Sequence, residues 1–204
     1  MRELAAWIAI LIMTTATIRY CYLLSAGRIK SSPAGWIIGA VAMTIGYIAY
    51  WQTPNPTWFG NVGQFLGSIE MWIVLGFMLW SLYRKGELAI EFEGFQKLCL
   101  ILALGIICVW ERTNRADIAF WLFQALLVLS YVAVVEKLIQ WNKNHDDVMM
   151  WFAIFIMSFL SLVPAGIDGD KFGLVSAIRG ILSSGITVVI MLRLDYRDRK
   201  SIGI

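Results

Sequence analysis

The chain has 204 residues, of which 59% are hydrophobic and 15% are charged, and its mean hydropathy is +0.71. Soluble domains carry about 25% charged residues, so the composition excludes an ordinary soluble protein and indicates an integral membrane protein. The net charge of +3 is too small to indicate a nucleic-acid-binding protein. The three cysteines lie in apolar segments without a CxxC spacing, which predicts neither a disulfide framework nor a zinc site.

Seven stretches of the sequence are long and apolar enough to cross a bilayer, which takes about 20 mostly apolar residues. We expect these spans at about 5–24, 34–52, 61–83, 96–111, 116–137, 147–165 and 172–193. The fourth stretch is the shortest, and the polar sequence ERTNR joins it to the fifth. The sequence therefore predicts an all-α membrane protein with seven transmembrane helices.

Residues 59–84 are repeated at residues 172–197, after a shift of 113 positions. The ungapped pair has nine identities in 26 positions, including the shared ends FG and YR, and a repeat of this length predicts two similar units. Since the same shift places the first three spans on the last three, with one span between, we expect two parallel three-helix repeats joined by a linker helix. The divisions are a first repeat over 1–84, a connector and linker helix over 85–115, and a second repeat with a basic tail over 116–204.

Lysine and arginine residues near the span ends are unequally divided between the two sides of the predicted bundle. Eleven lie on the side of the C-terminus and four on the side of the N-terminus. Cytoplasmic loops carry the excess of positive charge. We therefore predict a multi-pass membrane protein whose N-terminus is outside and whose C-terminus is cytoplasmic.

Small residues form a stripe at helical spacing in each copy of the repeat. The first stripe contains Gly60, Gly63, Gly67 and Glu70, and the second contains Gly173, Ser176, Gly180 and Ser183. Small residues let membrane helices approach closely, so helix packing is one interpretation of both stripes. A carboxylate in the middle of a span is costly and usually faces a partner or a wet cavity, which makes Glu70 a candidate functional residue.

Arg179 lies beside the second stripe, and the equivalent position of the first repeat is Leu66. Glu70 likewise has no acidic equivalent in the second repeat. Glu70 and Arg179 have opposite charges, and each lies on the inner face of its own repeat. We therefore expect the two side chains to meet near the axis between the repeats. A structural salt bridge, a gate or solute clamp, and separate snorkelling of the two side chains to the surface all remain open.

Other side chains within the spans are candidates for a solute cavity. Thr44, Tyr47 and Trp51 form a stripe that is typical of an interface anchor and that, facing inward, would form a stacking wall for a ring-shaped solute. The complete set of candidate solute-binding residues is Thr44, Tyr47, Trp51, Gln64, Glu70, Gln124, Arg179, Ser183 and Thr187.

Enzymatic chemistry has little support in this sequence. The single histidine, His145, lies in the sequence NKNHDD, which is typical of a solvated loop. No predicted span carries paired aspartates, a serine with a histidine, or an HExxH motif. Residues 172–193 contain no lysine, which excludes a retinal Schiff base in the last span. We expect no enzymatic activity, no catalytic residue, no metal and no cofactor.

The plan of three spans, one span and three spans, with the N-terminus outside, resembles the SWEET/PQ-loop class of seven-helix membrane proteins. The segment GRIKSSPAGWIIGAVAMTIGYIAYW is similar to the basic loop and aromatic-rich second helix of that class. The Pro-Gln pair of the PQ-loop group is absent, since the first span reads TTATIRYCYLL. PnuC-type vitamin transporters share the plan and are expected in the opposite orientation, and the KDEL receptor shares the fold, so fold does not fix function.

The resemblance implies a transporter or facilitator of sugars or small metabolites that works by alternating access between the two repeats. The alternative is a non-transporting membrane protein, either a receptor, an assembly factor or a structural subunit. The expected partners are the lipid bilayer and a small-molecule solute, with a homo-oligomer or a larger membrane complex also open. A polar cavity between the repeats would favour transport, whereas polar side chains on the outer face would favour the alternative.

Overall fold

The computed structural model describes residues 1–29, 31, 33–86, 90, 92, 94–142 and 144–202; for residues 133, 137, 141, 199, 201 and 202 only the backbone is described. The helices are α1 (Arg2–Ser25), α2 (Pro33–Trp51), α3 (Val62–Lys85), α4 (Gly94–Thr113), α5 (Ala116–Trp141), α6 (Val148–Asp168) and α7 (Lys171–Ile202). The described residues contain no strand. All seven helices are long and apolar enough to cross a membrane. The prediction of an all-α, seven-helix, multi-pass membrane protein is therefore confirmed at this level.

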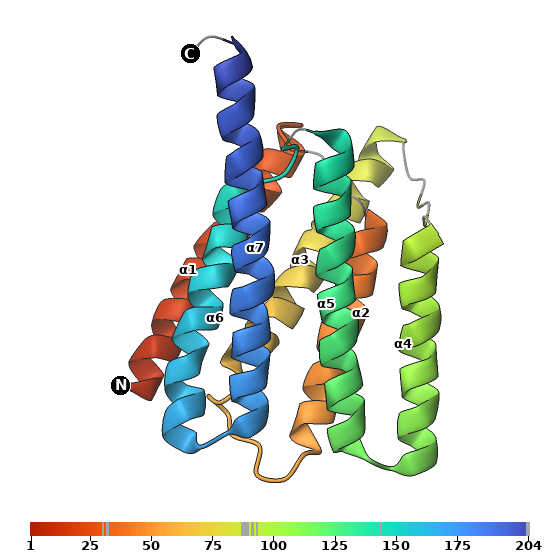
Figure 1. The fold of residues 1–204 in the computed structure, drawn as a ribbon, viewed down its shortest axis with the longest axis vertical. Helices are drawn as coiled ribbons and strands as arrows, with labels where there is room; N and C mark the ends of the chain where they lie inside the picture. The colour runs from red at the N-terminus through yellow and green to blue at the C-terminus, as the bar shows by residue number, and fades with distance from the viewer. Residues whose placement is uncertain are drawn as a thin grey trace.

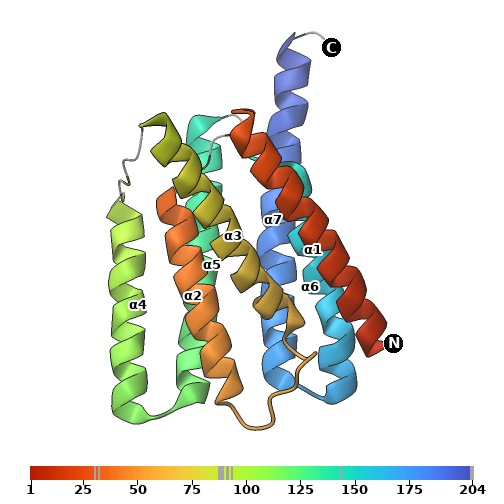
Figure 2. The same ribbon diagram turned by 180° about the vertical axis from the view of Figure 1, so that it is seen from behind.

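Successive helices run in opposite directions, so α1 begins and α7 ends at opposite ends of the bundle (Figure 1). We call these ends the N side and the C side. The connections after α2, α4 and α6 lie on the N side, and those after α1, α3 and α5 lie on the C side (Figures 1 and 2). The orientation of the protein, with the C side in the cytoplasm, stays a prediction. Two of the eleven basic residues on which it rests, Lys30 and Lys143, lie outside the described residues.

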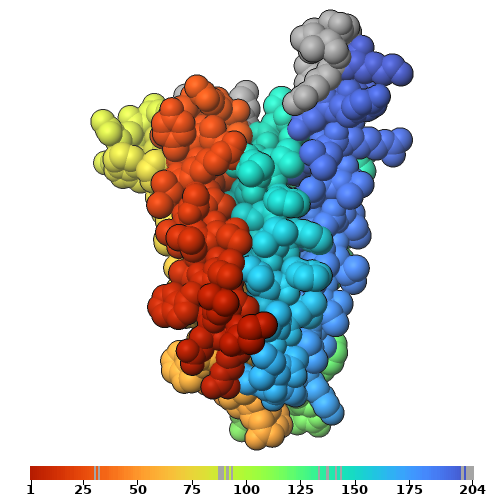
Figure 3. Space-filling model, turned by 90° about the vertical axis from the view of Figure 1, so that its left-hand side faces the viewer, coloured from red at the N-terminus to blue at the C-terminus, as the bar shows by residue number. Residues whose placement is uncertain are grey.

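The helices form a single bundle in which α3 lies between α1 and α2, and α7 lies between α5 and α6. α3 packs on both α1 and α2, and α7 packs on both α5 and α6. Two seams join these groups, one between α1 and α6 and one between α2 and α5. Figure 3 shows α1 lying along α6. α4 packs on α5 and α2 at the edge of the bundle (Figure 2).

Local sequence sets where the functional helices begin and end. α6 begins at Val148 because the Asp147 side chain caps it and accepts a hydrogen bond from the backbone N–H of Met149 at 3.3 Å. It ends at Gly169, which adopts a positive φ of 66° that glycine tolerates without strain. The apolar pattern predicts an end near residue 193, but α7 continues to Ile202, because the leucine, arginine and lysine residues that follow favour a helix.

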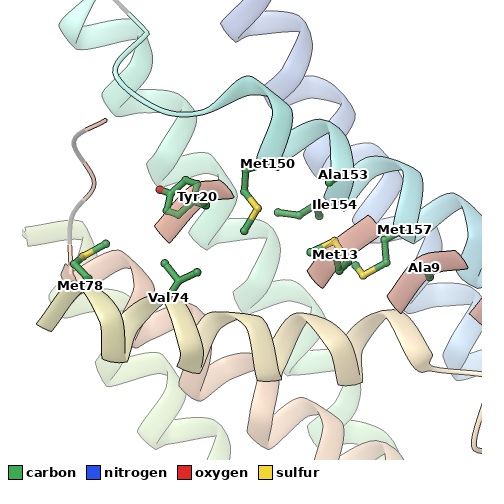
Figure 4. Packing of buried hydrophobic residues seen from close by; sticks show 9 residues of the cluster. All are labelled: Ala9, Met13, Tyr20, Val74, Met78, Met150, Ala153, Ile154 and Met157. Carbon is green, nitrogen blue, oxygen red and sulfur yellow. The ribbon is translucent and has the colours of Figure 1, made fainter. Parts of the chain in front are cut away.

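The apolar core forms between the helices, and the outward faces stay apolar. One cluster joins α1, α3 and α6 and is shown in Figure 4: Ala9, Met13, Tyr20, Val74, Met78, Met150, Ala153, Ile154 and Met157. A second cluster joins α2, α4 and α5. Large side chains such as Trp7 and Leu182 are exposed on the outside, as expected for helices that face lipid.

Candidate functional site

A cluster of buried amide and hydroxyl groups lies at the centre of the bundle. Gln64 of α3, Gln124 of α5 and Ser176 of α7 meet there. The Gln124 Nε2 atom donates to Gln64 Oε1 and to Ser176 Oγ, both at 3.2 Å. Gln64 Oε1 also accepts from Ser176 Oγ and from Asn61 Nδ2, both at 3.0 Å. The cluster therefore joins polar groups from both halves of the chain.

Glycine makes room for this cluster. A Cβ atom at Gly46 of α2 would lie 2.5 Å from Gln64 Nε2 and 3.4 Å from the Cβ of Phe123. Only glycine at this position lets the Gln64 side chain lie across α2, where its Nε2 donates to the backbone carbonyl of Met43 at 3.4 Å.

Arg179 of α7 extends the cluster toward the C side. Its Nε donates to Gln124 Oε1 at 2.5 Å, its Nη2 lies 4.0 Å from the sulfur of Met43, and its guanidinium carbon lies 6.0 Å from the centre of the Tyr131 ring. Its Nη1 atom is buried and has no hydrogen-bond partner among the described residues. Two of the guanidinium nitrogens are thus held in place while the third is open.

Glu70 of α3 is 5% exposed, and its buried Oε1 has no hydrogen-bond partner within the described part of the chain. Glu70 and Arg179 both line one cavity of about 20 Å³, which also touches Gln64, Tyr131 and Ser176. No ion pair joins the two charged residues in the ranges that the structure describes. A space of this size has room for about one water molecule. We call Glu70 Oε1 and Arg179 Nη1 the two open atoms.

A larger cavity of about 130 Å³ lies next to this one, on the C side, between α2, α4, α5 and α6. Its walls are mainly apolar and include the rings of Trp36, Tyr131 and Trp151. Tyr131, Met71 and Ile154 line both cavities. Tyr131 therefore stands at the boundary between the charged centre and the aromatic cavity.

The C-side wall of the aromatic cavity contains a second acidic residue, Asp146. One of its carboxyl oxygens accepts from the Tyr20 hydroxyl at 2.8 Å, and the other accepts from Trp151 Nε1 at 3.1 Å. Burial raises the pKa of Asp146. Beside it, Arg19 forms an ion pair with Asp147. These contacts fasten α1 to the start of α6 on the C side.

A close contact on the N side, which we call the N-side junction, joins the end of α2 and the loop before α3 to the residues around the start of α7. The Tyr50 hydroxyl hydrogen-bonds the Asp170 carboxyl group and accepts from the backbone N–H of Thr57 at 2.8 Å. Asp170 also accepts from the backbone N–H of Gly173 at 3.0 Å. A Cβ atom at Gly173 would collide with the backbone carbonyl of Gly60. Backbone meets backbone here without room for a methyl group.

The small-residue stripes face neighbouring helices, as their spacing predicts. Gly63 lies against Ser161 of α6, and Gly67 lies against the end of the Met43 side chain. Gly180 lies against Ser158. The stripes thus serve close packing and also leave the space in which the charged residues lie.

Four of the nine predicted site residues meet at the centre: Gln64, Glu70, Gln124 and Arg179. The remaining five, Thr44, Tyr47, Trp51, Ser183 and Thr187, line neither cavity.

Local contacts account for those five. Thr44 accepts from Trp72 Nε1 at 2.9 Å, between α2 and α3. Tyr47 and Trp51 belong to an N-side aromatic cluster. The Thr187 hydroxyl donates to the backbone carbonyl of Ser183 at 2.9 Å.

Several residues of the site lie outside the predicted set. Ser176 occupies the repeat position of Gly63 and could have been found by comparing the two stripes. Tyr131 lies seven residues after Gln124, on the same helical face. The sequence could not identify Trp151 as a site residue, because an aromatic residue near the start of a membrane helix is typical of an interface anchor.

Comparisons of the chain with protein-family models, with curated proteins and with solved structures find no match. Within the described residues, no group of three or more His, Cys, Asp or Glu side chains could hold a metal ion.

Proposed function

We propose that this protein is a membrane transporter for a small solute, as the resemblance to the SWEET/PQ-loop class implies. The observation that carries the proposal is the buried polar centre between the two halves of the chain, next to a cavity of about 130 Å³. Ionisable side chains in the middle of a membrane protein are costly and usually mark a solute or ion pathway. Glu70 and Arg179, with their two open atoms, are such side chains.

We further propose that α1–α3 and α5–α7 are two parallel repeats that α4 links. The packing supports this, because α3 lies between α1 and α2 as α7 lies between α5 and α6. The α1–α6 and α2–α5 seams are equivalent when the halves are exchanged. Gly60 and Gly173, which the repeat makes equivalent, contact each other on the N side. A two-fold axis through this contact would relate the two units.

Transport would proceed by rocking of one unit against the other. In the present conformation the larger cavity lies on the C side of the polar centre, while the Tyr50–Asp170 junction closes the N side. The opposite state would break this junction and close the aromatic cavity. With the N-terminus outside, as the distribution of basic residues predicts, the conformation described here has its cavity toward the cytoplasm.

The alternative is a receptor, an assembly factor or a subunit of a larger complex. Such a protein would be expected to present its polar in-span residues on the outer face. Gln64, Gln124 and Glu70 are instead at most 5% exposed. Their burial at the centre favours transport.

Uptake into proteoliposomes tests the proposal. Vesicles containing the wild-type protein are incubated with a defined mixture of sugars, amino acids, nucleosides and organic acids, and their contents are measured by mass spectrometry. We expect at least one solute to enter, and the double variant Glu70→Gln with Arg179→Gln to lose this uptake. Uptake no greater than in protein-free vesicles would overturn the proposal.

A further inference from the structure

The two open atoms restrict what can bind between them. They belong to one acidic and one basic residue, on α3 and α7, and both residues line the same cavity. A buried charged group without a partner is strongly unfavourable. A single small ion would satisfy one of the two groups and repel the other, whereas a zwitterion would satisfy both.

The surroundings of Arg179 hold its guanidinium group beside the cavity that the residue lines. Gln124 holds the Nε atom, and the group lies over the Tyr131 ring. A carboxylate is the acceptor that a guanidinium binds best. The Nη1 atom is therefore a preformed donor for a solute carboxylate.

Glu70 is the acidic group that is free to bind a cationic solute group. Asp146 also lines the neighbouring cavity, but both of its oxygens already accept hydrogen bonds, from Tyr20 and from Trp151. Glu70 Oε1 has no such donor in the described residues. An ammonium group, with three donors, would supply one.

The larger cavity indicates the rest of the solute. Its walls are apolar and include three aromatic rings, those of Trp36, Tyr131 and Trp151. Such walls suit a flat apolar group. Because Tyr131 also lines the charged cavity, one molecule could place its charged end at the polar centre and its ring in the larger cavity.

We propose that the solute is an α-amino acid with an aromatic side chain. Its ammonium group binds Glu70 and its carboxylate binds Arg179. The cavity of about 20 Å³ that these residues line has room for about one water molecule as it stands, so it must widen to admit the two groups. Its ring lies among Trp36, Tyr131 and Trp151. This inference rests on the proposed transport function and names the substrate class of the same site. A sugar carries neither charge and would leave both residues uncompensated.

Equilibrium binding to the wild-type protein in lipid nanodiscs tests the inference. Radiolabelled L-phenylalanine is the probe, and the competitors are phenethylamine, which lacks the carboxylate, 3-phenylpropionate, which lacks the amine, and L-serine, which lacks the ring. Each analogue that lacks one charge should bind about 10- to 100-fold more weakly than L-phenylalanine, the usual effect of losing one charge-assisted hydrogen bond. L-Serine should also compete poorly, because it leaves the aromatic cavity unfilled.

Two variants assign the charges to their residues. Glu70→Gln should weaken the binding of L-phenylalanine but not that of 3-phenylpropionate, whose carboxylate Glu70 repels. Arg179→Gln should weaken the binding of L-phenylalanine but not that of phenethylamine, whose ammonium group Arg179 repels. Retained binding of the analogue in each case also shows that the variant is folded.

The wild-type ligand comparison decides the inference even if a variant fails to fold. Undetectable binding of L-phenylalanine, or binding no tighter than that of the two singly charged analogues, would overturn it. If proteoliposomes then took up another solute, the transport proposal would stand and the substrate class would be wrong. If they took up nothing, both would fail.

Discussion

Replacing Gly173 by alanine tests the close contact between the two halves of the chain. The added Cβ would collide with the carbonyl oxygen of Gly60 and would lie 2.7 Å from its carbonyl carbon and 2.8 Å from an oxygen of Asp170. Two of these three atoms belong to the backbone, which cannot turn aside as a flexible side chain can. The contact can be relieved only by moving the loop before α3 away from α7.

The expected effect follows from two opposing terms. Overpacking a tight contact costs about 1–3 kcal/mol, whereas glycine to alanine within a helix gains up to about 1 kcal/mol. Gly76→Ala in α3 is the matched control, because no described atom beyond its own helical backbone lies within 4 Å of its added Cβ. The helix term favours Gly76→Ala at least as much, because Gly76 lies within α3 and Gly173 lies in the first turn of α7. Gly173→Ala should therefore be less stable than Gly76→Ala by about 1–3 kcal/mol.

The free energy of unfolding in mixed micelles, titrated with a denaturing detergent, measures this difference. Both variants should first elute as monodisperse species, so that the comparison concerns folded protein. Equal stability of Gly173→Ala and Gly76→Ala would refute the backbone contact, and with it the proposed axis between the two units.

Three further predictions concern polar groups. Tyr50→Phe should lower the stability by about 1–3 kcal/mol, because it leaves the buried Asp170 carboxyl group short of a donor; an unchanged unfolding midpoint would contradict the junction. Burial raises the pKa of Asp146, so its carboxyl group stays protonated to a higher pH in the folded chain than in the unfolded chain. The stability that this protonated group contributes is present at low pH and is lost as the pH rises through the raised pKa. Asp146→Asn should therefore flatten the loss of thermal stability on raising the pH, and an unaltered pH profile would refute this. The losses of unfolding free energy caused by Glu70→Gln and by Arg179→Gln should not add. The double variant should lose about 0.5–3 kcal/mol less than the sum of the two single losses. Strict additivity would show that the two groups do not interact.

The fold could be predicted from the sequence because the physical constraint is simple. A bilayer requires apolar stretches of about 20 residues, and seven such stretches are present. The end of α7 could not be placed, since its last turns are charged and carry no apolar signal. The two-repeat arrangement and the orientation of the termini stay predictions.

The central site could be predicted only in part. Gln64, Glu70 and Arg179 carry groups that lipid cannot satisfy, so an inward position follows from cost alone. Thr44 gives a false signal, because its hydroxyl donates to the backbone carbonyl of Ala40 at 2.7 Å and needs no polar cavity. The Tyr50–Asp170 junction joins residues 120 positions apart, a contact that no local pattern reveals.

Two-sided accessibility of single cysteines tests alternating access most directly. In a background where the three native cysteines are replaced by serine, Ser130→Cys places a thiol in the aromatic cavity and Ser161→Cys places one in the polar cavity toward the N side. Opening the N-side junction with Tyr50→Phe and Asp170→Asn should raise the labelling of the thiol at position 161 by an impermeant reagent on the N side. The same change should lower the labelling of the thiol at position 130 from the C side. Labelling rates that stay constant, or that rise together at both positions, would contradict alternating access.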